Sequence, residues 1–217
     1  MERFFMLDKY NTWADWNLVL TAKDITPPEP KTNYVSLDGM HGTLDLTEAL
    51  TGEVTYNDRT ITASFWTCEG TATDRARLLK TITTALHGKK IKVIEPDDMY
   101  HYYVGRLMIK KSANNLAYME FEVEILCEPW RYALEESERL VEVNGTTVDV
   151  VICNNCVKTL TPTVTVTGEV TISYSDATVT LTDGSYKITN LKLYQGANIF
   201  TVEGNGSVTF AYTEADL

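Results

Sequence analysis

The sequence NYVSLDGMHGTLDLTEALTGEVTYNDRTITASFWTC, at residues 33–68, shows most clearly how this chain is organised. Asp38, Gly39 and Gly42 interrupt it, because Gly tolerates the positive φ that tight turns need and Asp is a frequent turn residue. At residues 59–68 polar and apolar positions alternate, as in a half-buried strand. One face of that strand would carry Ile61, Ala63 and Phe65. The stretch therefore predicts a strand, a tight turn and a second strand.

Residues 71–87 carry the helical period. Thr71 and Asp74 have the spacing of a capping box, with Asp in place of Glu. Gly88 can adopt the left-handed conformation that ends a helix. His87 beside it can interact favourably with the negative C-terminal end of the helix dipole. Apolar residues recur three, four and seven positions apart, at Leu78, Leu79, Ile82, Ala85 and Leu86. We predict one helix here.

The remainder of the N-terminal part has the patterns of strands and turns. Residues 24–31 contain three prolines and predict an extended connector. Apolar and acidic residues alternate most clearly in the stretch that ends at Cys127. In a strand, Met119, Phe121, Val123 and Ile125 would point inward, and Glu120, Glu122 and Glu124 would point outward. Further strands are predicted within the first 25 residues and at 90–95, 99–110 and 116–127, with turns at 96–98 and 112–115.

From residue 146 the chain is rich in Thr, Val and Gly, in short runs separated by turn residues. This spacing without a helical stretch predicts an antiparallel sandwich. The predicted breaks include Asn144-Gly145, Thr167-Gly168 and Gly204-Asn205-Gly206. Residues 135–217 hold 11 acidic and 4 basic residues, a clear shift from the preceding part. We predict a mainly β protein with one helix and two domains, at residues 1–133 and 134–217.

Composition excludes several classes of function. The chain has 217 residues and a formal net charge of -11, which repels phosphate backbones and anionic lipid heads. No apolar run approaches the roughly 20 residues that span a bilayer. The N-terminus lacks the apolar core and cleavage site of a signal peptide. We expect no nucleic-acid or membrane contact, and assembly in a cytoplasm.

Candidate chemical groups do not combine into a site. Cys153-Asn154-Asn155-Cys156 has the spacing of redox and zinc motifs, but a second pair of ligands and a following helix are both missing. We interpret it as a hairpin turn, and Cys68 and Cys127 as small buried residues. His41, His87 and His101 lack metal-ligand spacing. The sequence predicts no catalytic, metal or cofactor site, and therefore no enzyme.

Several ordered strings resemble the distal tail proteins of long-tailed siphophages. Leu37 to Glu48 reads LDGMHGTLDLTE, and Thr55 to Arg59 reads TYNDR. Three further stretches agree with the family in the same order: ITPPEPK from Ile25 upstream, ALHGK from Ala85 downstream, and then DD at Asp97 through YYVGR from Tyr102. Matching positions are Gly39, Gly42, Leu44, Asp45, Tyr56, Arg59, His87, Gly88, Gly105 and Arg106.

The resemblance implies a structural virion protein. Its N-terminal domain would be a split, barrel-like domain of the tail-tube type that forms a hexameric ring. Its C-terminal domain would be a galectin-like sandwich, with Leu193 to Asn198 and Val202 to Val208 as a closing hairpin. The ring would lie at the tail tip or baseplate, between the tail-tube protein and a tail fibre or lysin protein. Arg59 and Arg106 would either satisfy a carboxylate such as Asp45 or bridge subunits.

Two alternatives remain open. One is a tail-tube subunit, which resembles the same N-terminal domain. The other is a carbohydrate-binding module, for which Tyr174, Tyr186, Tyr194 and Tyr212 are the aromatic candidates within the sandwich. Since residues 134–217 hold no insertion longer than an ordinary loop, we expect host-receptor attachment to be delegated to another protein.

Overall fold

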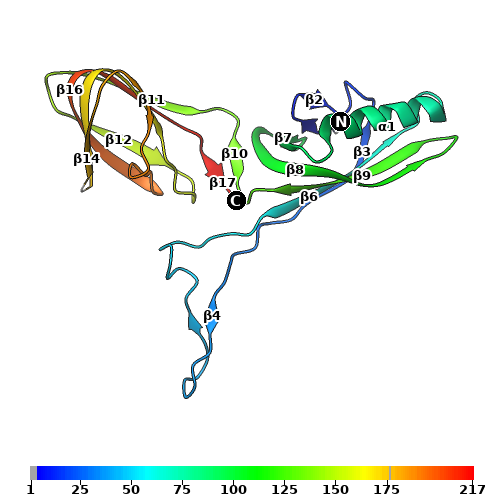
Figure 1. Ribbon diagram of the computed structural model, residues 1–217, viewed down its shortest axis with the longest axis horizontal. Helices are drawn as coiled ribbons and strands as arrows, with labels where there is room; N and C mark the ends of the chain where they lie inside the picture. Colours follow the sequence, from blue (N-terminus) through cyan, green and yellow to red (C-terminus); the bar gives the residue numbers. More distant parts are fainter. Residues whose placement is uncertain (1–3, 176) are drawn as a thin grey trace. The chain divides into compact units, whose positions relative to one another are not determined.

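The computed structural model describes residues 4–175 and 177–217, and it divides into two compact units (Figure 1). Unit 1 comprises Met1–Arg131 and Leu217, and unit 2 comprises Tyr132–Asp216. The described residues form antiparallel sheets and one helix. The predicted mainly β fold with a single helix is therefore confirmed.

Unit 1 is built on an open sheet that does not close into a barrel across the described strands. The short strand β10 (Arg131–Ala133), where unit 2 begins, pairs with β17 (Ala215–Asp216) of unit 2. The order along the sheet is β2 (Tyr10–Asn11), β1 (Met6–Leu7), β7 (Lys90–Glu95), β8 (Asp98–Asn114), β9 (Met119–Cys127), β6 (Arg59–Thr67) and β3 (Val19–Ile25).

The two central strands follow the predicted alternation. β6 buries every second residue from Arg59 to Thr67, and β9 does the same from Met119 to Cys127. Apolar side chains of both strands therefore meet on one face of the sheet. That face is the core of unit 1, and it includes Ile61, Phe65, Leu107, Phe121, Val123 and Ile125.

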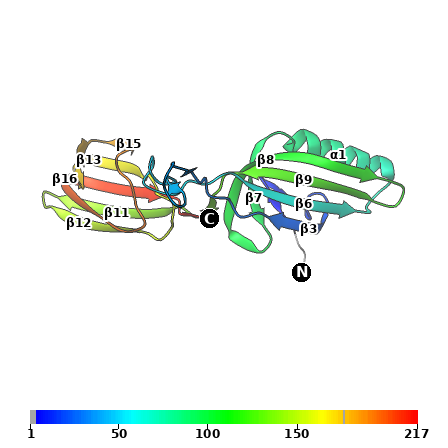
Figure 2. The ribbon, with the colours of Figure 1, turned by 90° about the horizontal axis from the view of Figure 1, so that it is seen from below.

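Helix α1 (Ala72–Leu86) packs over the core of unit 1 through Ile82 and Leu86 (Figures 1 and 2). The Thr71 side chain accepts a hydrogen bond from the Asp74 N–H, and the Asp74 side chain accepts one from the Thr71 N–H. The predicted capping box is confirmed. Because α1 covers one face, the other face of the sheet carries Thr62, Ser64 and the glutamates of β9.

Residues 26–58, which we name the extension, connect β3 to β6. It contains the two-stranded sheet of β4 (Tyr34–Val35) and β5 (Leu44–Asp45), separate from the larger sheet. None of these residues is buried. At the base of the extension Lys31 N–H donates to Thr55 and Asn57 N–H donates to Glu29. The extension is therefore a paired double strand that leaves the core.

Unit 2 contains a six-stranded sheet around two long strands, β13 (Thr163–Tyr174) and β16 (Gly196–Tyr212). β13 pairs with the part of β16 from Thr201 to Ala211, which is almost the whole length of β13. The first half of β16 pairs with β12 and the second half with β11. The remaining strands are β11 (Ser137–Asn144), β12 (Val148–Asn154), β14 (Ala177–Leu181) and β15 (Gly184–Lys187).

Two predicted breaks in unit 2 are wrong, and so is the predicted closing hairpin. Gly168 lies inside β13, and Gly204 and Gly206 lie inside β16, which runs without a turn. Gly168 pairs with Gly206, and a Cβ on Gly206 would lie 1.9 Å from the Thr167 carbonyl oxygen. The glycines let two strands bend together at close approach instead of reversing the chain.

Candidate functional site

The predicted site residues fall in three places, and the first is the tip of the extension. Gly39 and Gly42 have φ of 84° and 81°, so each holds a turn that other residues adopt with strain. Leu44 is exposed and pairs with Val35 across the hairpin. These residues shape the tip.

Asp45 organises the returning strand of the extension. Its carboxylate accepts a hydrogen bond of 2.9 Å from the Thr47 N–H and another from the Thr47 hydroxyl. These bonds, that from the hydroxyl first, lower the pKa of Asp45 and keep it anionic. Thr47 Oγ1 in turn accepts from Asn33 N–H at 3.1 Å. Asp45 therefore fixes the loop.

The second place is the base of the extension. Arg59 is buried at the start of β6, and its Nε and Nη2 both donate to the Pro129 carbonyl oxygen, at 2.9 and 2.6 Å. Its guanidinium lies 5.1 Å from the Tyr103 ring centroid. The Tyr56 ring meets Trp130 edge-on at 5.8 Å. Both contacts join the base of the extension to the chain that follows β9.

Arg59 does not pair with Asp45, because its acceptor within this chain is the Pro129 carbonyl oxygen. Burial lowers the pKa of Arg59. A guanidinium still stays charged at neutral pH, so the fork remains a strong donor. Beside it, burial raises the pKa of Cys127 to about 12, and this thiol stays protonated.

Gly105 continues this row across the sheet. Ile91, Gly105, Cys127 and Arg59 are successive partners on four neighbouring strands. A Cβ on Gly105 would lie 2.5 Å from Cys127 Sγ and 2.7 Å from the Leu126 carbonyl oxygen. Gly105 is therefore required by close packing between strands, and not by a turn.

The third place joins the end of α1 to β8. His87 caps the helix, and its Nδ1 accepts the Ile109 N–H at 3.0 Å. Gly88 has φ of 76°, and its N–H donates to Leu107 at 2.7 Å. The Arg106 guanidinium donates to the Gly88 carbonyl oxygen. His87, Gly88 and Arg106 together tie the helix end to a strand.

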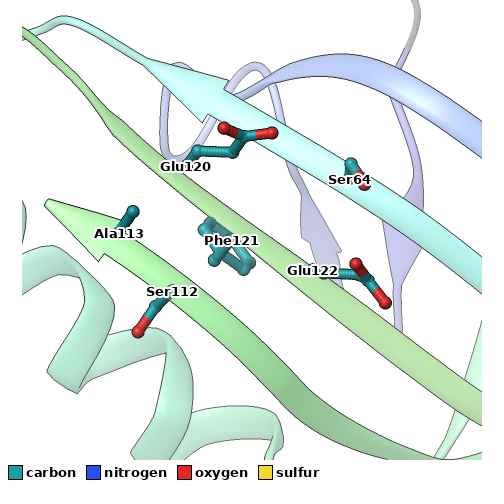
Figure 3. Close-up of a pocket in the computed structure, with 6 residues that line it drawn as sticks. All are labelled: Ser64, Ser112, Ala113, Glu120, Phe121 and Glu122. Carbon is teal, nitrogen blue, oxygen red and sulfur yellow. The ribbon is translucent and has the colours of Figure 1, made fainter.

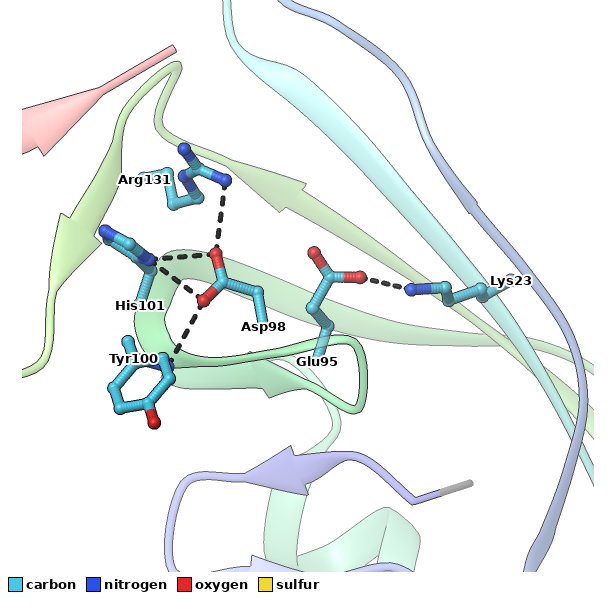
Figure 4. A network of polar contacts seen from close by, with 6 residues as sticks. All are labelled: Lys23, Glu95, Asp98, Tyr100, His101 and Arg131. Carbon is cyan, nitrogen blue, oxygen red and sulfur yellow. Dashed lines mark hydrogen bonds and ion pairs between the residues drawn. The ribbon is translucent and has the colours of Figure 1, made fainter. Parts of the chain in front are cut away.

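A polar network near the turn between β7 and β8 escaped the sequence analysis (Figure 4). Asp98 accepts from His101 Nδ1 at 2.8 Å, from Arg131 at 3.1 Å and from the Tyr100 N–H at 3.2 Å. Burial by itself would raise the pKa of Asp98, but these partners outweigh it and the net direction is downward. Lys23 of β3 pairs with Glu95, the last residue of β7. The sequence showed only a solvated pair of acids.

Arg75 of α1 was also missed. It is buried, and it donates to Gly70 at 2.7 Å, to Asn115 at 2.6 Å and to the Asn114 side chain at 3.3 Å. One guanidinium thus joins the start of the helix to the turn between β8 and β9. A signal was present, because Arg75 lies four positions before Leu79, on the apolar stripe.

A pocket on the sheet of unit 1 carries two of the outward glutamates of β9. Ser64, Glu120 and Glu122 line it, with Ser112, Ala113 and Phe121 from the neighbouring positions (Figure 3). Its volume is about 190 Å³, below the roughly 300–1,000 Å³ of most ligand sites. Two carboxylates and two serines are the polar groups among the six lining residues, and no histidine, cysteine or third acidic side chain joins them.

The cysteines depart from the predictions in two respects. Cys127 is buried as expected, but Cys68 is exposed, because β6 ends at Thr67 and the chain turns toward the helix cap. Residues 153–156 form no hairpin, since β12 pairs with β16. Asn154 holds this segment: its amide donates to Lys158 and Leu193 at 2.9 and 3.0 Å.

The described residues form neither a metal cluster nor a membrane-spanning helix. No three His, Cys, Asp or Glu side chains there lie together as metal ligands. Helix α1, the helix of the described chain, is too short and too polar to cross a membrane.

Three tyrosines of unit 2 have partners within the unit. The Tyr174 ring stacks on Phe200 at 4.5 Å, and the Tyr186 and Tyr212 hydroxyls donate to backbone carbonyls.

A solved structure has the same architecture as this chain. No family model matches the sequence, and no curated protein matches it. Among solved structures, the crystal structure of the SPP1 Dit protein matches with a TM-score of 0.70, over 99% of both chains and at 14% identity. That protein is described as a paradigm of the hub adsorption apparatus in phages that infect Gram-positive bacteria. The chain has the Dit fold. At this identity the likeness establishes the fold alone.

The Dit fold agrees with the strings quoted from the sequence, so the resemblance to distal tail proteins is confirmed at the level of the fold. The likeness covers both units, each compared over almost its whole length. The ten matching residues fall at the tip of the extension, at its base and at the end of α1. Their contacts position the backbone, and none of them forms a catalytic pair.

Proposed function

We propose that this chain is a structural protein of a phage tail, a distal tail protein of the adsorption apparatus. The observation that carries the proposal is the Dit fold over 99% of both chains. The ordered sequence strings from Ile25 to Arg106 support it as well. We place the protein in the virion, at the tail tip or baseplate, after assembly in the host cytoplasm, and we assign it no enzymatic activity.

We propose further that unit 1 forms a ring, hexameric by the resemblance. A ring closes when each copy presents two different, complementary surfaces. Unit 1 offers candidates for both: β3 is an edge strand with one pairing partner, β6, and the extension exposes apolar side chains. Exposed strand edges and apolar patches of this kind are usually covered in an assembly.

The face of the sheet opposite α1 suits the channel side of such a ring. It carries Glu120, Glu122 and Glu124, with Lys110 paired to Glu124 at 2.9 Å. An acidic surface disfavours phosphate binding. We therefore assign no nucleic-acid binding to the protein, and we assign the tail-tube protein and a fibre or lysin protein as axial partners. Attachment of receptor-binding proteins is left to other components.

Light scattering and negative-stain microscopy of the purified protein test the ring. A monomer has a mass of 24.4 kDa, and we expect particles of about six times that mass, alone or with the tail-tube protein. Open-ended tubes of the protein alone would favour a tail-tube subunit instead. Monomers at high concentration in the presence of the tube protein would overturn the ring.

Glycan-array binding tests the alternative of a carbohydrate-binding module. In our reading the tyrosines of unit 2 serve packing, as the stacking of Tyr174 on Phe200 illustrates. We expect no specific glycan signal from the intact protein. Specific binding that is lost on substitution of the exposed Tyr194 would favour the module.

A further inference from the structure

One corner of unit 2 departs from the ordinary pattern of a solvated sheet. The outward side chains of an antiparallel sheet that faces water are usually polar. On β13 and β14 they are: the Thr171 and Thr180 hydroxyls lie 2.9 Å apart, and those of Ser173 and Thr178 3.1 Å apart. β12 and the first part of β16 instead turn small apolar side chains outward. We name these the β12 patch: Val151, Cys153, Ala197 and Ile199.

The members of the β12 patch are neighbours across two strands. Val151 lies directly opposite Ile199 in the register, and Cys153 directly opposite Ala197. Because residues two apart on a strand point to the same face, the two pairs lie side by side. All four are exposed, Val151 to 51% and Ile199 to 60%. Apolar side chains that adjoin one another on a surface indicate a contact site, as single ones do not.

The patch lies beside an open strand edge. β12 pairs with β16, and no strand of the described residues pairs with its other side (Figure 2). Such an edge offers backbone N–H and C=O groups to an added strand. At the end of β12 the Ile152 and Cys153 carbonyl oxygens already accept hydrogen bonds from side chains of β16. The edge that an added strand can use therefore runs from Val148 to Val151.

The charge around the patch is negative. β12 and β16 carry one acidic residue each, Asp149 and Glu203, and no lysine or arginine. Asp149 points to the same face as Val151, two positions further on, and accepts a hydrogen bond from the Thr201 hydroxyl at 2.8 Å. Residues 135–217 as a whole hold 11 acidic and 4 basic residues. This surface attracts a basic partner and repels a second copy of itself.

We propose that the β12 patch and the edge of β12 together bind an extended, basic and apolar segment of another protein, which adds to the sheet as a strand. An apolar side chain of the segment lies opposite Val151 and covers Ile199. A lysine or arginine two positions along lies opposite Asp149. In this mode of recognition the main chain supplies affinity and the alternate side chains supply specificity. The inference concerns unit 2 alone and does not depend on the ring.

Fluorescence anisotropy with a labelled peptide of sequence TVTITKT tests the binding. The peptide places valine, isoleucine and lysine on one face, in the order that antiparallel pairing with Cys153, Val151 and Asp149 requires. We expect saturable binding to the intact protein. Glutamate in place of the lysine, or proline in place of the threonine before it, should weaken binding at least about tenfold, because like charges repel and proline donates no hydrogen bond.

Two substitutions test the site on the protein. Val151→Thr and Ile199→Thr keep β-branched residues and give the patch the polar character of the rest of the face. Together they should weaken peptide binding at least about tenfold, through the loss of apolar contact. Thr180→Val is the matched control, because Thr180 is exposed on β14 at the opposite edge of the sheet. It should bind the peptide as the native protein does, and circular dichroism checks that each variant is folded.

The exposed cysteines provide a second measurement. Cys153 lies within the patch and Cys68 lies in unit 1, and both are exposed, whereas Cys127 and Cys156 are buried. Alkylation by iodoacetamide is followed at each cysteine by mass spectrometry. The peptide should slow the reaction of Cys153 and leave that of Cys68 unchanged.

Several results would overturn the proposal. These are the absence of saturable binding of TVTITKT, equal binding of the glutamate peptide, and binding that survives the paired substitutions at Val151 and Ile199. Equal protection of Cys68 and Cys153 would also overturn it. Native particles that associate with each other, and cease to do so in the paired variant, would assign the patch to a second copy instead. None of these results bears on the ring, which microscopy tests separately.

Discussion

The two units stabilise their junctions by different chemistry. Among the described residues of unit 1 the buried charged side chains are Arg59 and Arg75, and each donates two or more hydrogen bonds to the backbone where chain segments meet. In unit 2 the buried polar side chains of the described residues are Asn154 and Asn198, both neutral. The bend of its long strands depends on glycines. Charged side chains are buried in unit 1 and neutral amides in unit 2, among the described residues.

This difference follows from the chain segments that meet in each unit. In unit 1 the extension and the chain after β9 leave the sheet near one another, and a charged fork can fix a free carbonyl at such an exit. In unit 2 the long strands β13 and β16 stay within the sheet. What constrains them is the close approach of their two backbones. The Asn198 amide donates to Tyr194 at 2.8 Å and accepts from the Tyr174 hydroxyl at 3.0 Å, which satisfies it without charge.

The largest expected effect is in unit 2, at the bend. Gly206→Ala places a methyl group against the Thr167 carbonyl and forces a residue with a side chain to φ near 150°. Strain and overpacking together should lower the free energy of unfolding by roughly 3–5 kcal/mol. Urea denaturation followed by circular dichroism measures the loss.

Gly196→Ala is the matched control, because its φ is 97° but an added Cβ meets nothing within 4 Å. It should cost only about 1–2 kcal/mol. All four tryptophans lie in the first 130 residues, so tryptophan fluorescence reports on unit 1 and should not change. Equal losses for the two variants would show that close approach at the bend is unimportant.

A smaller effect is expected in unit 1 for Arg75→Met, which keeps the long side chain and removes every donor. The carbonyls of Gly70 and Asn115 lose their charged partner. The free energy of unfolding should fall by about 2–4 kcal/mol. Arg77→Met, at an exposed position with one ion pair of 3.4 Å, should stay within about 0.5 kcal/mol. If the two variants behave alike, charge does not stabilise unit 1.

The smallest effect on the free energy of unfolding is expected for Asp98→Asn, and it should depend on pH. The partners of Asp98 lower its pKa in the folded state, so its stabilisation is complete above the unfolded pKa and is lost as the pH falls through the folded pKa. Asp98→Asn should cost about 1 kcal/mol at neutral pH. The gap to the native protein should close as the pH falls from about 5 to 3. Asp149→Asn, in unit 2, should leave the tryptophan-monitored transition unchanged, and a gap that persists at acid pH would contradict the prediction.

Elements that depend on near neighbours could be predicted from the sequence. The alternation of β6 and β9 and the capping box at Thr71 and Asp74 repeat over two to four residues, and they were found at the expected positions. The extension was expected as a strand, a turn and an extended connector. Its separation from the core was not, since a run of exposed side chains has no local signature.

The candidate site was predicted as a set of residues and not as a set of contacts. Arg59 and Pro129 are 70 positions apart, and Arg75 and Asn115 are 40 positions apart. No spacing rule connects such pairs. The resemblance to the family identified Gly105 and Arg106 as matching positions. The cross-strand partner of Gly105, Cys127, became evident only from the register of β8 and β9.

The sequence by itself determined where the chain turns a face to its core, where its helix begins and ends, and that its fold is mainly β. These follow from residue periodicity and from capping groups within one turn of helix. The tertiary structure decided whether a glycine reverses the chain or bends it. Gly206 is compatible with either, and the strand beside it, β13 with Gly168 opposite, selects the bend because only glycines allow the two backbones to approach so closely.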